Sequence, residues 1–127
     1  MPTPEEVRAR VHAYIERSNE NDKNAVVAMF APDAHWYDPV GQPPHVGRDG
    51  VAEFWDQTRA MADRIEMKPR DVIVAGNEAA LIFEIHATIG EHTMVMDAVE
   101  TFEVDGEGLF TLVKAYWDMG RARPLSA

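Results

Sequence analysis

The spacing of the apolar residues changes near Ile65 from a helical period to a period of two. Before that point apolar side chains recur every three or four positions, as in Val7, Val11 and Ile15, which predicts amphipathic helices. After it they alternate with polar side chains, which predicts strands. Helices followed by a run of strands indicate an α+β fold, because the sheet must bury one face against the helices.

Three helices are expected in the first half of the chain. The first begins at Thr3-Pro4-Glu5-Glu6, since threonine can cap a helix, proline suits its first position and glutamate can close a capping box. The second covers residues 25–30 and is stopped by Pro32. The third begins near Asp49. It places five side chains on one side, namely Val51, Phe54, Trp55, Thr58 and Met61.

Four strands are expected in the second half, at residues 65–75, 79–89, 93–104 and 109–118, with glycine-containing turns between them. A shorter strand at residues 35–38 precedes the third helix. This order predicts a curved antiparallel sheet packed against three N-terminal helices. We expect residues 1–127 to form a single domain that ends in a loose tail from Arg121 to Ala127.

The charge of the chain limits its partners. Its 22 acidic and 12 basic residues give a formal net charge of -10, which repels nucleic acid and anionic membranes. Cysteine is absent, so disulfides and thiolate chemistry are excluded. The first residues show no basic stretch followed by an apolar run, and no apolar run approaches the roughly 20 residues of a membrane helix. We therefore expect a soluble cytoplasmic protein without nucleic-acid or membrane partners.

Asp38 is the first candidate for chemistry. It follows Trp36 and Tyr37 at the end of the short strand and precedes Pro39. Aspartate before proline commonly starts a turn, and on the residues alone this is the better interpretation. In a partly apolar site, burial would instead raise the pKa of the carboxyl group and make it a general base near neutral pH.

Tyr14 and Glu100 are two further candidates. Tyr14 lies on the apolar stripe of the first helix, where its hydroxyl is either satisfied within the core or donates to a developing oxyanion. Strand alternation puts Glu100 on the same face as Phe102 and puts Asp97 on the opposite face. Glu100 is therefore either buried and neutralised, or exposed at an edge with a partner such as Lys114.

A metal site is not expected from the sequence. The chain has five histidines, none of which shows the paired spacing of metal ligands: His12, His35, His45, His86 and His92.

The run Met29-Phe30-Ala31-Pro32-Asp33-Ala34-His35-Trp36-Tyr37-Asp38-Pro39-Val40-Gly41 resembles a stretch of the bacterial ketosteroid isomerases that ends in Asp-Pro-Val-Gly. Other segments are similar to that family, namely Tyr14 followed by Asn19 to Asp22, Glu53-Phe54-Trp55, Asn77-Glu78-Ala79-Ala80 and Ala115-Tyr116-Trp117. The likeness spans nearly the whole chain, in order. It implies the cone-shaped α+β fold of the nuclear-transport-factor-2-like (SnoaL-like) superfamily, with a deep apolar pocket and a homodimeric assembly.

The resemblance also implies a steroid delta-isomerase. Asp38 matches the general base and Tyr14 matches an oxyanion donor, while Glu100 falls where the family has an aspartic acid kept protonated by its apolar site. Asp38 would move a proton of a hydrophobic β,γ-unsaturated 3-ketosteroid through a dienolate, and no cofactor would be needed. Six residues would line the substrate pocket: Phe54, Trp55, Phe83, Phe102, Val113 and Trp117.

The sequence departs from the family pattern at several places. Glu100 is one methylene longer than the family's aspartate. Asp97 is an additional acid, and a shift of one residue in strand register would change which acid faces inward. Phe30 and Trp55 replace tyrosines that support the catalytic phenol in some members.

Two other functions stay open. One is a polyketide-cyclase-like or epoxide-hydrolase-like enzyme of the same superfamily, although those epoxide hydrolases use an Asp-Arg-Asp arrangement and the inner strands here supply only Lys114. The other is a non-catalytic binding or dimerisation module. It predicts that Asp38 is dispensable and forms a salt bridge with a basic neighbour such as Arg48.

Overall fold

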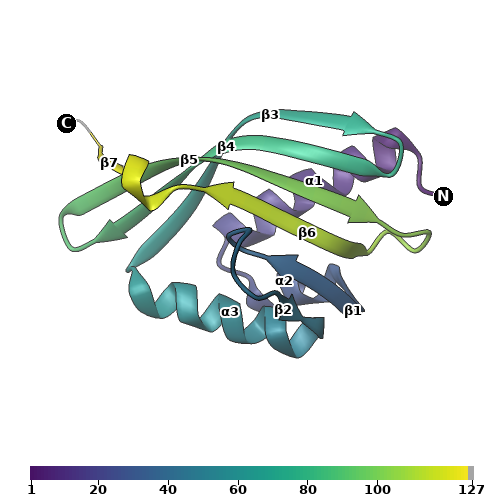
Figure 1. The fold of residues 1–127 in the computed structure, drawn as a ribbon, viewed down its shortest axis with the longest axis horizontal. Coiled ribbons are helices and arrows are strands. Elements are labelled where there is room, and N and C mark those ends of the chain that lie inside the picture. Colours follow the sequence, from purple (N-terminus) through teal and green to yellow (C-terminus); the bar gives the residue numbers. More distant parts are fainter. Residues whose placement is uncertain (126–127) are drawn as a thin grey trace.

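The computed structural model describes residues 1–125, in which three helices pack against one sheet (Figure 1). The helices are α1 (Pro4–Asn19), α2 (Lys23–Ala28) and α3 (Gly47–Met61). The strands are β1 (Phe30–Tyr37), β2 (His45–Val46), β3 (Arg64–Ala75), β4 (Glu78–Ile89), β5 (His92–Val104), β6 (Phe110–Trp117) and β7 (Arg123–Pro124). A short 3-10 helix, η1 (Met119–Arg121), connects β6 to β7. The predicted α+β fold is confirmed.

The sheet is curved and open, with the strand order β2-β1-β6-β5-β4-β3 and β7 paired to β5. Strands β3 to β6 form the predicted antiparallel meander. Strand β1, however, runs parallel to β6, with Trp36 opposite Val113. The sheet is therefore mixed, and the expectation of a purely antiparallel sheet is wrong. Because β1 and β6 are far apart in sequence, alternation within each strand carries no information about their relative direction.

The capping box predicted for α1 is present. The Thr3 side-chain oxygen accepts the Glu6 N–H at 3.2 Å, and the Glu6 carboxylate accepts the Thr3 N–H at 3.2 Å. The helix buries the predicted stripe, which consists of Val7, Val11, Tyr14, Ile15 and Ser18. Because α1 packs across β3 and β4, this stripe brings Tyr14 to the inner side of the sheet.

The prediction for the segment around Pro32 is wrong in two respects. Helix α2 ends at Ala28, before the proline is reached, and β1 begins at Phe30 instead of residue 35. Pro32 lies within β1, where the pairing with β6 is irregular between Phe30 and His35. A residue without an N–H is tolerated there because it breaks no regular ladder.

Two smaller predictions also fail. Met61, expected on the inner side of α3, is 70% exposed because the helix ends there. The tail is not loose up to Leu125, since Arg123 pairs with Val95 of β5 and bonds to Asp97. Residues 126–127 of the predicted tail lie outside the described part of the chain.

The core lies between the helices and the sheet. Its largest fully buried side chains include Phe30, Phe102 and Phe110. Among the helices of residues 1–125, none is both long and apolar enough to cross a membrane.

Candidate functional site

Tyr14 is held in the core by aromatic rings on three sides. Its ring lies edge-on to Phe30, Phe102 and Phe110, with centroid distances of 6.4, 5.3 and 5.7 Å. Only 5% of the residue is exposed. Burial, followed by the nearby carboxyl group of Glu100, raises the pKa of Tyr14 well above its usual value. The phenol therefore keeps its proton and can act as a hydrogen-bond donor.

Glu100 occupies the centre of the sheet. It lies in β5 between Leu81 of β4 and Ala115 of β6, and only 2% of it is exposed. Burial raises its pKa well above the usual value, and the charge of Asp38 raises it further. Lys114 instead lies opposite Thr101, and within residues 1–125 no basic group forms a salt bridge with Glu100. The exposed-edge interpretation is wrong, and burial favours the protonated form of Glu100.

One oxygen of Glu100 accepts two long hydrogen bonds. The Tyr14 hydroxyl donates to Oε2 at 3.4 Å, and the Trp36 indole N–H donates to the same atom at 3.3 Å. Such bonds in catalytic sites are often long until a substrate is bound. The arrangement places a phenol and a carboxylic acid side by side.

Asp97 faces away from this group. It is exposed, and it forms ion pairs with Arg70 at 3.7 Å and with Arg123 at 3.1 Å. The alternation that placed Asp97 and Glu100 on opposite faces of β5 is confirmed. Of the two acids whose orientation depended on the strand register, Glu100 is therefore the one that faces inward.

Asp38 follows the last residue of β1 and lies beside the end of β6. Its Oδ1 accepts a hydrogen bond of 2.6 Å from the indole N–H of Trp117. Burial raises the pKa of Asp38 to about 6, although the bond from Trp117 lowers it in part. Arg48 does not pair with this carboxylate, since its guanidinium donates to the Phe30 carbonyl at 2.8 Å. The salt bridge expected of a non-catalytic module is absent from the described chain.

Asp38, Tyr14 and Glu100 thus lie within electrostatic reach of one another. The charge of Asp38 raises the pKa of both Tyr14 and Glu100. No hydrogen bond joins Asp38 to either group within residues 1–125, so the base and the pair of donors are separate parts of one site. An ionisable base with two neutral donors is suited to removing a proton while stabilising a developing negative charge.

The six predicted lining residues all belong to the core or pack against it. Trp55, Phe83, Phe102 and Val113 are buried, whereas Phe54 and Trp117 are partly buried at its edge. Phe102 also contacts Tyr14, and Trp117 contacts Asp38.

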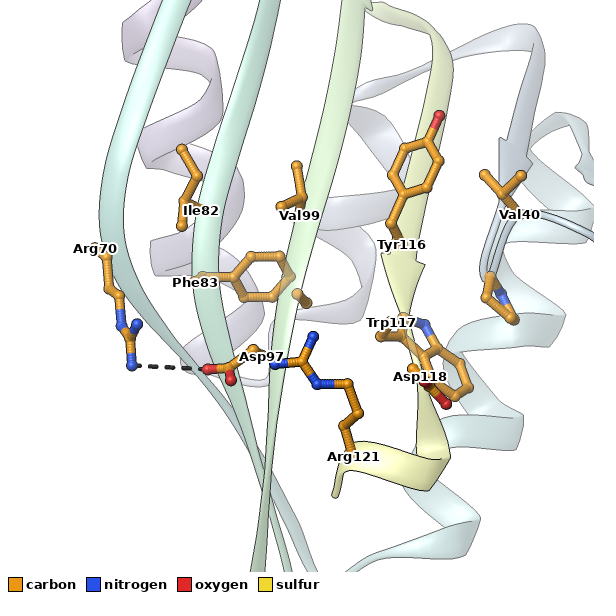
Figure 2. Close-up of a pocket in the computed structure, with 12 residues that line it drawn as sticks. Val40, Arg70, Ile82, Phe83, Asp97, Val99, Tyr116, Trp117, Asp118 and Arg121 are labelled. Carbon is orange, nitrogen blue, oxygen red and sulfur yellow. Dashed lines mark ion pairs between the residues drawn. The ribbon is translucent and has the colours of Figure 1, made fainter. Parts of the chain in front are cut away.

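A hollow of about 460 Å³ lies on the face of the sheet that the helices leave uncovered (Figure 2). Its wall includes the neighbouring side chains of Ile82, Val99 and Tyr116, with Val40 beside them. Of the six predicted lining residues, Phe83 and Trp117 border this hollow. Tyr14, Asp38 and Glu100 do not, so the hollow is distinct from the three-residue site.

The sequence interpretation missed the two indole hydrogen bonds. Trp117 was expected to line a pocket, and Trp36 only to make the surroundings of Asp38 apolar, yet each donates to a carboxyl group. The alternation in the strand expected at residues 35–38, which puts Trp36 on the same face as Asp38, is the one available signal for Trp36. The contact of Trp117 with Asp38 depends on the parallel pairing of β1 with β6.

The histidines do not gather into a ligand cluster. His86 bonds to Glu84 at 2.9 Å, and the His45 ring stacks on Phe54 at 4.1 Å. Across residues 1–125, no group of three His, Cys, Asp or Glu side chains is arranged to hold a metal ion.

Comparisons with known proteins identify relatives across nearly the whole chain. The model of the SnoaL-like domain matches residues 11–113. A steroid delta-isomerase from Nocardioides simplex is 28% identical over 115 residues, covering 91% of this chain and 92% of that protein. The solved structure of the epoxide hydrolase/cyclase-like enzyme SalBIII, associated with pyran ring formation in polyether salinomycin, superposes with a TM-score of 0.88. That match has 23% identity and covers 98% of this chain and 100% of SalBIII, so it supports the fold alone.

Proposed function

The chain belongs to the SnoaL-like domain family, and on that premise we propose that it is an isomerase of hydrophobic β,γ-unsaturated ketones, with 3-ketosteroids as the favoured substrates. One observation carries the proposal. Asp38, whose pKa burial raises to about 6, lies near two buried groups, Tyr14 and Glu100, whose pKa values burial raises well above their usual values. The similarity to a steroid delta-isomerase supports the choice of substrate class.

The proposed reaction transfers one proton within the substrate. The Asp38 carboxylate takes a proton from the carbon between the ketone and the isolated alkene, and the electrons of that C–H bond form a dienolate. Asp38 then returns the proton to the far carbon of the dienolate, which gives the conjugated enone. The atoms balance without a cofactor, because the carboxylate first accepts and then donates the same proton.

The two donors, Tyr14 and Glu100, stabilise the dienolate oxygen. The Tyr14 hydroxyl and the protonated Glu100 carboxyl donate hydrogen bonds to this oxygen, whose negative charge grows as the proton leaves. Both donors are buried, so their dipoles act in a medium of low dielectric and need little reorganisation. Within residues 1–125 Asp38 bonds to Trp117 and to neither donor, so it does not compete for their protons.

The surroundings of the site favour a neutral, apolar substrate. Phe54, Phe102 and Trp117 provide aromatic surface close to the polar groups. The net charge of -10 disfavours anionic substrates.

A second candidate function is the opening or cyclisation of an epoxide. The pairing of a base, Asp38, with a protonated acid, Glu100, also suits this chemistry, in which the acid protonates the epoxide oxygen and the base activates an attacking hydroxyl group. However, no arginine bonds to either carboxyl group within residues 1–125, unlike the Asp-Arg-Asp arrangement of epoxide hydrolases of this fold.

The two functions are separated by presenting the wild-type protein with each substrate class. We expect a β,γ-unsaturated 3-ketosteroid to give the ultraviolet absorbance of a conjugated enone, and we expect a hydrophobic epoxide to remain unchanged. Absence of ketone turnover above buffer would contradict the proposal. Epoxide opening without ketone turnover would favour the second candidate.

The donor role of Glu100 is tested by comparison with Asp97, the acid on the opposite face of β5. We expect Glu100→Gln to lower kcat on the order of a hundredfold, because it weakens a donor to the dienolate oxygen. Asp97→Asn is the matched control, since Asp97 is exposed and paired with Arg70 and Arg123. Equal and negligible effects of the two substitutions would leave Tyr14 as the sole donor.

A further inference from the structure

Trp36 donates its indole N–H to Glu100, a contact that the proposed reaction does not itself use. The indole is 5% exposed and is held between Phe30 and Phe54, with ring centroids 5.2 and 4.9 Å away. Its Nε1 lies 3.3 Å from Glu100 Oε2. Only two rotatable bonds connect the indole to the backbone. The ring contacts on both sides therefore fix the direction of its N–H.

The indole nitrogen is a donor and never an acceptor. An oxygen that receives its hydrogen bond therefore acts as an acceptor. In a protonated carboxyl group the carbonyl oxygen accepts more strongly than the hydroxyl oxygen does. Since Oε2 receives the bonds from both Trp36 and Tyr14, Oε2 takes the carbonyl role and the proton of Glu100 lies on Oε1.

The hydrogen bond from Trp36 to Glu100 becomes important when the Tyr14 hydroxyl changes its acceptor. In the structure the Tyr14 hydroxyl donates to Oε2, yet the proposed reaction requires the same hydroxyl to donate to the substrate oxygen. When Tyr14 changes partner, Oε2 loses one of its two donors. A buried acceptor left without any donor is costly, and Trp36 is the donor that remains.

We infer that Trp36 is a positioning residue that holds Glu100 Oε2 as an acceptor, so that the Oε1 proton points to the oxyanion and Tyr14 is free to turn to the substrate. This inference rests on the proposed function for its catalytic consequence. The orientation of Glu100 itself is independent of the substrate.

Infrared spectroscopy tests the orientation without any substrate. The carbonyl stretch of protonated Glu100 is identified as the band that disappears in Glu100→Gln. We expect Trp36→Phe to move this band to higher frequency, because the carbonyl oxygen loses a hydrogen bond while the aromatic packing is largely kept. A band that does not move overturns the inference.

A second measurement leaves Trp36 unchanged, in case its replacement prevents folding. The chain has three tryptophans, so their indole N–H resonances can be assigned from Trp55→Phe and Trp117→Phe. We expect the Trp36 resonance to shift in Glu100→Leu, which removes the acceptor. An unshifted resonance overturns the contact on which the inference depends.

Kinetics then tests the catalytic consequence with a double-mutant cycle. We expect Trp36→Phe to lower kcat about tenfold with little change in KM, as for loss of one hydrogen bond in the transition state. In a Glu100→Leu background the same substitution should have no further effect. An equal loss in both backgrounds shows that Trp36 acts by packing and overturns the inference. If the wild-type protein does not isomerise ketones, the proposed function fails, and the infrared band alone decides the role of Trp36.

Discussion

The two carboxyl groups of the site differ in their hydrogen-bond donors and in their burial. Asp38 is partly buried, and the Trp117 N–H bonds to it at 2.6 Å, which favours its charged form. Glu100 is fully enclosed and accepts only long hydrogen bonds from the neutral side chains of Tyr14 and Trp36. Burial therefore outweighs hydrogen bonding at Glu100. Asp38, with a pKa of about 6, is therefore suited to act as a base, whereas burial favours the protonated form of Glu100. The proposed chemistry requires this difference.

The pH dependence of the reaction follows from the raised pKa of Asp38. The base must be ionised, so kcat/KM should fall as the pH drops below about 6 and should be level above it. Trp117→Phe removes a bond that stabilises the charged form, so the pKa of Asp38 rises and the inflection moves to higher pH. Profiles of kcat/KM against pH for both proteins check this. An inflection that stays in place or moves to lower pH in Trp117→Phe contradicts the assigned role of Trp117.

At the scale of the elements, the site depends on neighbours that are distant in sequence. The alternation in β5 put Glu100 on the same face as Phe102 but left open whether that face is buried, and the stripe of α1 put Tyr14 on the apolar side of the helix. The parallel pairing of β1 with β6 was not predictable from either strand alone, although it brings Asp38 to Trp117. The faces on which Tyr14 and Glu100 lie therefore followed from the periodicity within single elements. The hydrogen-bond partners of the two carboxyl groups depend instead on tertiary packing.

The start of α3 provides a test of how closely the helix packs on β1. Gly47 has a φ of +69°, and a Cβ there would lie 3.0 Å from the Pro32 carbonyl oxygen. We expect Gly47→Ala to lower the free energy of unfolding by more than the roughly 1–2 kcal/mol of left-handed strain alone, because β1 must also move. Denaturant unfolding checks this.

Gly76→Ala is the matched control for that substitution. Gly76 has a similar φ of +58°, but a Cβ there meets nothing within 4 Å. The decrease in the free energy of unfolding of Gly76→Ala should therefore reflect backbone strain only. Equal decreases in the free energy of unfolding for the two variants would show that the close approach of α3 to Pro32 adds nothing to the cost of Gly47→Ala.

The uncovered face of the sheet exposes apolar side chains. Val99 and Tyr116 are 36% and 45% exposed and lie side by side on β5 and β6 (Figure 2). Arg70 and Asp97 border the same hollow, so the surface carries both signs of charge. A surface of this kind can pair with its own copy about a two-fold axis.

We therefore propose that the protein forms a homodimer through this face. Sedimentation should give twice the chain mass of 14.3 kDa. Val99→Lys should give the monomer, because it buries a charge in the interface. Met61→Lys, which changes an exposed residue at the end of α3, should leave the dimer intact. A wild-type monomer, or a dimer that tolerates Val99→Lys, contradicts the proposal.

The proposed reaction depends on proton transfer by Asp38, and replacement of this residue by asparagine tests that role. Asparagine keeps the size of the side chain and an oxygen for the Trp117 N–H, but it cannot accept a proton near neutral pH. Enone formation from a β,γ-unsaturated 3-ketosteroid should be compared at pH 8, with Asp33→Asn as the control because Asp33 is exposed on β1, the strand that Asp38 follows. We expect Asp38→Asn to lower kcat by a factor of roughly 10² to 10⁴ and Asp33→Asn to have no effect. Full turnover by Asp38→Asn would contradict the account.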